Sequence, residues 1–200
     1  LLEHLRGLAQ ARLDGRAGRF GTEGFDGAEL RGKPVGIIGL GDIGGRVAQL
    51  AAGFGAHVRY WSRTRKPERE TPQIRYADLT SVLAESDVVS LNVAITPQSR
   101  GLLSAGRILC LRPNAILIST VPPEAIDLGA LVARLEQQDL TFITIHGQGL
   151  APYLDRLQRL PNAVLYPPLA HRTREAFVAR EAAFLHNLEQ ALTAPLGPAP

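Results

Sequence analysis

The sequence contains no methionine, a single cysteine and almost no lysine. Because Cys110 has no partner cysteine, an intrachain disulfide framework and a zinc site built on several cysteines are excluded. Methionine is missing even at position 1, so we expect the chain to begin inside a longer protein or to have been trimmed. Lys33 and Lys66 are the only lysines among 22 basic residues, which we attribute to genome composition.

Long apolar runs and a strong charge of either sign are also missing. No apolar run approaches the ~18 residues that a transmembrane helix needs, and the first residues lack the basic and apolar regions of a signal peptide. The net charge of +3 is too small to indicate nucleic-acid binding by itself, despite a pI near 9.4. We therefore expect a cytoplasmic protein with no membrane span and no nucleic-acid partner.

What is present is typical of a folded protein. The 200 residues are 45% hydrophobic and 20% charged, which fits one large domain or one domain with arms. Apolar residues between Leu1 and Leu13 recur at helical spacing, and the glycine-rich stretch up to Gly32 indicates a loop or arm. We expect a helix and arm over 1–32, a main domain over 33–193 and a flexible tail over 194–200.

From Pro34 onward, short apolar runs alternate with helical stretches. The strand-like runs are 35–38, 58–61, 88–93, 115–118, 142–145 and 163–166. The helical stretches include 43–54, 79–84, 123–137 and 173–192. Runs that are apolar at nearly every position indicate strands buried on both faces, and therefore a parallel sheet with helices on each side.

A glycine-rich turn lies between the first strand and the first helix of this pattern. Gly39, Gly41 and Gly44 fit the spacing G-x-G-x-x-G, with Asp42 and Ile43 between the last two glycines. In this context the motif predicts a Rossmann-type, doubly wound α/β sheet in which the helix N-terminus receives a dinucleotide pyrophosphate. A glycine turn without a ligand is the alternative. Asp42 would be unfavourable there unless its side chain points to solvent.

The end of the second strand indicates which dinucleotide is bound. An NAD site usually has Asp or Glu about 20 residues after the glycines, where it binds the ribose 2′-hydroxyl. Here Ser62, Arg63, Thr64 and Arg65 follow the strand instead. A hydroxyl and guanidinium groups suit a 2′-phosphate, so NADP is favoured, with NAD possible. The alternative is a solvated basic loop.

Four stretches of the chain resemble the D-isomer-specific 2-hydroxyacid dehydrogenases. They are 32–44, 90–101, 112–120 and 160–165, in matching order and spacing. The segment from Ser62 to Thr64 resembles the NADP-preferring glyoxylate and hydroxypyruvate reductases of that family. The resemblance implies that 33–193 is a dinucleotide-binding domain, and that 1–32 is a dimerisation segment of a homodimer. It covers only the cofactor domain, so we expect either an excised piece or a natural protein without the substrate-binding half.

The resemblance also implies further cofactor contacts. These are Val93, Ala94, Thr96, Val121 and His146, the last at the position that contacts the nicotinamide carboxamide in the family.

The resemblance further implies an arginine, a glutamate and a histidine that bind the 2-keto acid and transfer a proton. The matching positions hold Pro122, Ala151 and Pro168, none of which can do so. His146 and His171 are the nearest histidines, and we interpret His171 as a surface or capping residue. No catalytic residue is predicted, and no metal site.

Three functions remain open from the sequence. The first is a cofactor-binding protein that has lost the family chemistry, such as a redox sensor, a partner subunit or a decayed copy. The second is an active NADP-dependent oxidoreductase with altered chemistry or with a substrate domain elsewhere. The third is an interaction module that binds no nucleotide.

Overall fold

The structure is a computed structural model that describes residues 1–170 and 172–193. The predicted flexible tail and His171 lie outside the described residues. The described chain divides into two units, which meet in sequence at Tyr166 and Pro167.

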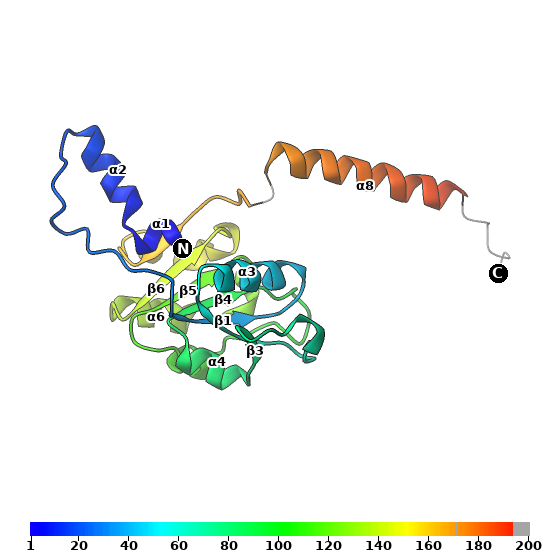
Figure 1. Ribbon diagram of the computed structural model, residues 1–200, viewed down its shortest axis with the longest axis horizontal. Helices are drawn as coiled ribbons and strands as arrows, with labels where there is room; N and C mark the ends of the chain where they lie inside the picture. Colours follow the sequence, from blue (N-terminus) through cyan, green and yellow to red (C-terminus); the bar gives the residue numbers. More distant parts are fainter. Residues whose placement is uncertain (171, 194–200) are drawn as a thin grey trace. The chain divides into compact units, whose positions relative to one another are not determined.

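The first unit is built on a sheet of seven parallel strands in the order β3-β2-β1-β4-β5-β6-β7 (Figure 1). The strands are β1 (Pro34–Ile38), β2 (His57–Trp61), β3 (Ile74–Tyr76), β4 (Val88–Leu91), β5 (Ala115–Ser119), β6 (Leu140–Thr144) and β7 (Ala163–Leu165). The strand order reverses direction between β1 and β4, and a sheet of this kind binds ligands at the carboxyl ends beside that point. The predicted doubly wound α/β fold is confirmed.

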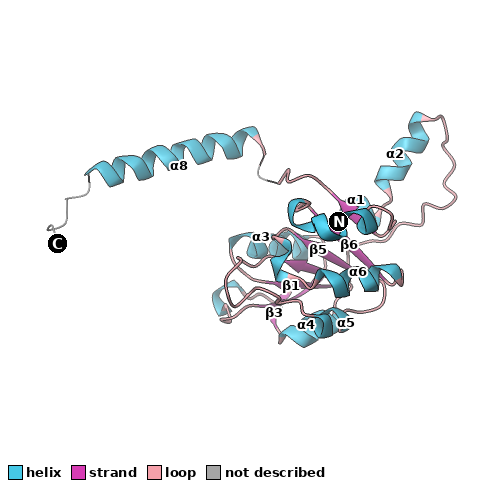
Figure 2. Cartoon of the chain, turned by 180° about the vertical axis from the view of Figure 1, so that it is seen from behind, coloured by secondary structure: helices cyan, strands magenta, loops and turns pink. Residues whose placement is uncertain are grey.

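Helices cover both faces of this sheet (Figures 1 and 2). The helix α3 (Asp42–Gly53) lies on one face, where Ala48 and Ala51 pack with Ile37 and Tyr60. The other face carries α4 (Leu79–Glu85), α5 (Ala105–Leu109) and α6 (Leu128–Glu136), whose apolar residues form the larger core. Strand residues alternate between the two cores, as Ile37 and Ile38 do, which explains why the central strands are mostly apolar on both faces.

The N-terminal segment does not form one continuous helix. The helix α1 (Leu2–Leu5) ends before Gly7, which has a φ of 58°, and α2 (Leu8–Arg16) begins after it. Residues other than glycine rarely adopt this left-handed backbone conformation, so the glycine at this position permits the break between the two helices. The loop that follows returns to α1, because the Ala28 N–H donates to the Leu5 carbonyl at 2.8 Å.

One predicted helix begins later in the structure, and two short elements were not predicted. The helix expected from Pro123 begins at Leu128, because Pro123–Ala125 form a separate 3-10 turn (η2) and Asp127 caps α6 by accepting the Ala130 N–H at 3.0 Å. The other 3-10 turns are η1 (Pro67–Arg69) and η3 (Gln148–Tyr153), and η3 leads into α7 (Leu154–Leu157). The short elements β3 and α5 were not predicted.

The second unit contains one helix, α8 (Arg174–Thr193). Within this unit the helix leaves several large apolar side chains exposed: Val178, Phe184, Leu185, Leu188 and Leu192. Arg180 lies over the Phe177 ring, 4.9 Å from its centroid. Within 1–170 and 172–193, no helix has the length and hydrophobicity needed to cross a bilayer.

Candidate functional site

Each of the three motif glycines is suited to its position for a different structural reason. Gly39 has a φ of 94°, and a β-carbon there would lie 2.6 Å from the Asn92 carbonyl oxygen. A β-carbon on Gly44 would lie 1.9 Å from the Gly39 carbonyl oxygen, so Gly44 lets α3 approach the turn. Gly41 faces open space, with no atom within 4 Å of a β-carbon built on it. The turn is therefore closely packed at Gly39 and Gly44 and open at Gly41. A phosphate site needs such an opening, because the phosphate must approach the backbone closely.

The helix α3 begins directly after the open glycine. Gly41 precedes the first helical residue and has no side chain to cap the first-turn N–H groups. Such a helix N-terminus favours an anion through its free donors and its dipole. The Asp42 side chain is 99% exposed and its Oδ1 accepts from Arg69 Nη2 at 3.1 Å, so the carboxylate points to solvent.

A pocket of about 270 Å³ opens beside this turn. It brings together eight of the predicted cofactor residues: Gly39, Gly41, Ser62, Arg63, Thr64, Val93, Ala94 and Thr96. Its other lining residues are Leu40, Trp61, Lys66, Asn92, Gln98, Ser99 and Leu102. Six predicted residues do not line it: Asp42, Ile43, Gly44, Arg65, Val121 and His146. The pocket thus joins the glycine turn to the ends of β2 and β4.

The cations of the basic loop after β2 have two different environments: some line the pocket and one is paired with a carboxylate. Arg63 is exposed and lines the pocket together with Lys66. Arg65 instead binds Glu70, with Nε 2.7 Å from Oε1 and Nη2 2.9 Å from Oε2. The Ser62 hydroxyl donates to the Thr64 carbonyl at 2.7 Å. The cations that a ligand in the pocket would meet are therefore Arg63 and Lys66.

The loop after β4 is held by a buried hydroxyl. Ser99 Oγ accepts the Thr96 N–H at 2.8 Å and donates to the Ala94 carbonyl at 2.6 Å. Ser99 is buried, so these bonds are screened from water and fix the loop that carries Val93, Ala94 and Thr96. These bonds hold this wall of the pocket without any contact to a ligand.

A second set of polar groups links the ends of β4, β5 and β6. His146 Nε2 lies 3.1 Å from the Thr120 carbonyl oxygen, and the His146 N–H donates to Thr144 Oγ1 at 3.1 Å. Thr120 Oγ1 lies 3.4 Å from Asn92 Oδ1, which in turn belongs to the pocket wall. Val121 is buried next to this group. These residues lie at the carboxyl edge where the second half of a dinucleotide would extend.

The residues expected from the sequence resemblance at the catalytic positions are Pro122, Ala151 and Pro168, and none of them has an acidic or basic side chain. Pro122 precedes the turn η2, and Ala151 lies in η3. These two turns touch, because a β-carbon on Gly149 would lie 2.1 Å from Pro123 Cγ. Pro168 belongs to the second unit. Within the described residues, no group of three or more His, Cys, Asp or Glu side chains could hold a metal ion.

Asn92, Glu70 and Arg69 also shape the site, although they were not predicted from the sequence. Asn92 follows a strand end directly, so its position alone could have indicated a pocket residue. Arg69 lies in the turn η1 and Glu70 directly follows it. Only the three-dimensional course of the β2–β3 connection brings Arg69 to Gly41 and Glu70 to Arg65.

Comparisons with known proteins agree with this geometry. Residues 1–170 match the profile of the NAD-binding domain of D-isomer specific 2-hydroxyacid dehydrogenases. A glyoxylate reductase of Thermococcus litoralis is 38% identical over 159 residues, which cover 76% of this chain and 46% of the relative. The chain spans about half the length of the curated relatives it matches.

Solved structures show the same fold. The structure of D-2-hydroxyisocaproate dehydrogenase superposes with a TM-score of 0.85 at 27% identity, covering 99% of this chain and 64% of that one. A glyoxylate reductase from Paecilomyes thermophila superposes with a TM-score of 0.82 at 28% identity, covering 96% of this chain and 58% of that one.

Proposed function

The chain belongs to the D-isomer specific 2-hydroxyacid dehydrogenase family, and on this premise we propose that it binds NADP(H) in preference to NAD(H) without carrying the family's acid–base chemistry. The observation that carries the proposal is the pocket wall after β2. Among the described residues, those lining the pocket include the cations Arg63 and Lys66 and no carboxylate. A 2′-phosphate needs positive donors, whereas an unphosphorylated ribose is usually bound by a carboxylate.

The residues present fit a dinucleotide. The open face at Gly41 and the first turn of α3 would receive the pyrophosphate. Ser62, Arg63 and Thr64 would hold the phosphorylated ribose, and the loop from Val93 to Thr96 would line the groove. Val121 and His146 would lie toward the nicotinamide, which supplies hydride chemistry when it is bound.

Three vacant positions support the loss of the family's reaction. Reduction of a 2-keto acid needs a cation for the carboxylate and a proton donor for the developing alkoxide. Pro122, Ala151 and Pro168 offer neither. Pro123 also packs closely against Gly149, and this contact joins η2 and η3. Pro122 directly precedes η2 and Ala151 lies within η3, at the expected arginine and glutamate positions. We infer that this chain binds the cofactor as a sensor or partner subunit.

The relatives favour a second candidate function. Glyoxylate reductases cover most of this chain, and the chain spans about half of their length. An NADP-dependent reductase of a small 2-keto acid would then draw its carboxylate-binding and proton-donating residues from elsewhere in a longer protein. NADPH oxidation measured with glyoxylate and other small 2-keto acids separates the candidates, since the first predicts no oxidation above background.

Cofactor binding is tested through Trp61, the only tryptophan, which lines the pocket. We expect NADPH to quench its fluorescence saturably, with an affinity at least tenfold above that of NADH, or ~1.4 kcal/mol. Arg63→Ala should remove most of this difference by weakening NADPH alone. Arg75→Ala is the matched control, because Arg75 is exposed on β3 and does not line the pocket. Absence of binding by either nucleotide to the folded chain would contradict the proposal and favour an interaction module.

We also propose that the chain forms a homodimer through its N-terminal segment. The segment leaves Leu2, Leu8, Leu13 and Phe20 exposed, and exposed apolar clusters mark interaction surfaces. Sedimentation velocity should report a dimer for the unmodified chain. The paired substitution Leu8→Glu and Leu13→Glu should yield a monomer with an unchanged circular dichroism spectrum, whereas a monomeric unmodified chain would contradict the proposal.

A further inference from the structure

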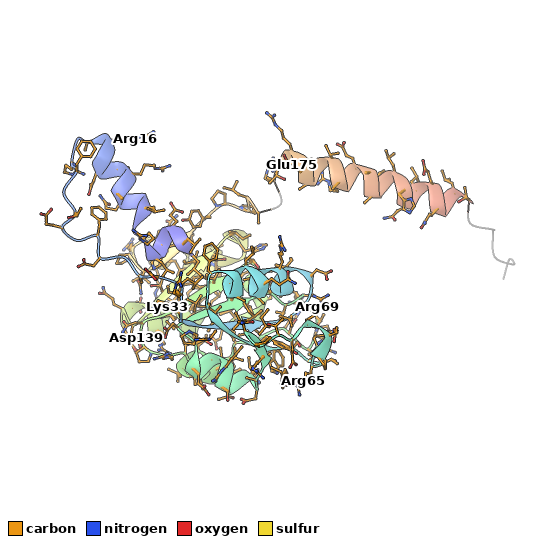
Figure 3. The ribbon with its side chains drawn as sticks, in the orientation of Figure 1. Arg16, Lys33, Arg65, Arg69, Asp139 and Glu175 are labelled. Carbon is orange, nitrogen blue, oxygen red and sulfur yellow. The ribbon has the colours of Figure 1, made fainter. Side chains whose placement is uncertain are left out.

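Arg69 lies in the turn η1 between β2 and β3, and its side chain contacts the glycine turn at the start of α3 (Figure 3). Its Nη1 donates to the Gly41 carbonyl at 2.7 Å, and its Nη2 donates to Asp42 Oδ1 at 3.1 Å. These contacts join residues 28 and 27 positions apart, so they are not a local feature of the chain. One guanidinium therefore binds both the Gly41 carbonyl and the Asp42 carboxylate at the start of α3.

The sequence makes room for this arginine. A β-carbon on Gly45 would lie 2.9 Å from Arg69 Nη1. Nη1 is the far end of a flexible side chain and could move aside for a β-carbon. Glycine lets the guanidinium keep its contact with the Gly41 carbonyl without such a shift.

The contact with the Gly41 carbonyl supports the orientation of the first helical peptide. In a trans peptide the carbonyl and the following N–H point in opposite directions. The Gly41 carbonyl also accepts the Gly45 N–H at 2.8 Å, so both donors hold it along the helix. The Asp42 N–H consequently points out of the helix N-terminus, the direction from which an anion is bound.

The contact with Asp42 balances a charge that opposes this binding. A carboxylate at the first position of α3 would repel a pyrophosphate. The Arg69 guanidinium offsets this charge and is itself 40% exposed. It lines a separate groove with Asp42, Gly45 and Arg46, and it does not line the cofactor pocket.

We propose that Arg69 is a positioning residue for the dinucleotide pyrophosphate, which it serves by neutralising Asp42 and by orienting the Gly41–Asp42 peptide. The inference rests on the proposed function, because it assumes that a dinucleotide occupies the pocket. Arg69 acts through Asp42 and Gly41, without a place in the pocket wall. Its loss would leave an unpaired negative charge at the helix N-terminus.

The test is a double-mutant cycle read by Trp61 fluorescence with NADPH as the probe. Arg69→Ala should weaken NADPH binding by about threefold or more, in the range of one ion pair near the surface. Asp42→Asn in the same chain should restore at least about threefold, because the repulsive charge is gone. A role of Arg69 in stability alone would not be rescued by removing Asp42. The defect of Arg69→Ala should also shrink in high salt.

Two controls localise the effect. Arg46→Ala removes the same charge from the groove that Arg46 and Arg69 both line. Arg46 contacts Gln49 and not the glycine turn, so NADPH affinity should stay unchanged. Adenosine 2′-phosphate lacks a pyrophosphate, so Arg69→Ala should bind it as the unmodified chain does. A loss of NADPH affinity below threefold, a lack of rescue by Asp42→Asn or an equal loss of adenosine 2′-phosphate binding would overturn the inference. If the unmodified chain binds no dinucleotide, the proposed function itself fails.

Discussion

Arg65 and Glu70 form a two-point ion pair within the connection that follows β2. Arg65 Nε lies 2.7 Å from Glu70 Oε1 and Nη2 lies 2.9 Å from Oε2. The buried Tyr60 hydroxyl donates to the same carboxylate at 2.9 Å and accepts the Lys66 N–H at 2.8 Å. Glu70 thus links the basic loop to the buried Tyr60 through Arg65, whereas Arg63 lines the pocket.

We predict that Glu70→Gln weakens NADPH binding more than NADH binding. The neutral amide keeps the size of Glu70 but loses the charge that holds Arg65, so the loop that presents Arg63 becomes less ordered. Trp61 fluorescence titrations with both nucleotides measure the effect. Glu68→Gln is the matched control, since Glu68 lies in the same connection and is exposed. Equal affinities of Glu70→Gln and the unmodified chain would contradict this role.

The same ion pair predicts how stability depends on pH. Hydrogen bonding to Arg65 lowers the pKa of Glu70 to about 2 from its usual 4.5. A carboxyl with a depressed pKa stabilises the fold above its unfolded pKa, and this contribution is lost as the pH falls toward its folded pKa. The difference in urea midpoint between the unmodified chain and Glu70→Gln should therefore be constant above pH ~5 and should shrink toward pH 2. A difference that grows on acidification would contradict the assignment.

The sheet could be predicted from the sequence because most of its strands are short apolar runs that alternate with helical stretches. The short β3 and the five-residue α5 carry too few residues to show a period. The helix expected at Pro123 starts later because Asp127 provides a stronger N-cap than the proline pair. Local signals of similar strength compete there, and packing of Leu131 and Leu135 into the core decides between them.

The candidate site was predictable where its chemistry follows strand ends. Gly39 and Ser62 come directly after strands and Gly41 lies two residues beyond Gly39, so their place at the carboxyl edge follows from the topology. The separate tasks of Arg63 and Arg65 could not be predicted, because both follow the same strand. Only the course of the chain to Glu70 decides which guanidinium is paired.

We predict that Gly44→Ala destabilises the fold by about 3 kcal/mol or more and abolishes nucleotide binding. Its β-carbon would meet the Gly39 carbonyl, which is backbone and cannot move aside without opening the turn. Urea unfolding followed by circular dichroism measures the loss. Gly53→Ala is the matched control in the same helix, because no atom lies within 4 Å of the added carbon. That variant should be as stable as the unmodified chain or up to about 1 kcal/mol more stable.

We predict that Arg134→Ala destabilises the fold by about 3 kcal/mol. Arg134 is buried in α6, where it donates to the carbonyls of Ile108 and Arg112 and pairs with Asp139 at 3.1 Å. The truncation leaves these acceptors without their donor. Arg156→Ala is the control, since Arg156 pairs with Glu136 at the surface and should cost less than about 1 kcal/mol. Equal urea midpoints of the two variants would contradict the structural role of Arg134.

We predict that His146→Ala weakens NADPH binding but leaves adenosine 2′-phosphate binding unchanged. His146 bridges the ends of β5 and β6 through the Thr120 carbonyl, at the part of the edge proposed for the nicotinamide, whereas the adenosine end lies at Ser62 and Arg63. Its removal should also cost about 1 kcal/mol of stability by leaving that carbonyl without its donor. His146→Gln can keep a donor near Thr120, so it should recover stability more fully than NADPH affinity. An equal loss of affinity for both ligands would mean that His146 only stabilises the edge of the sheet, and it would contradict a position beside the nicotinamide.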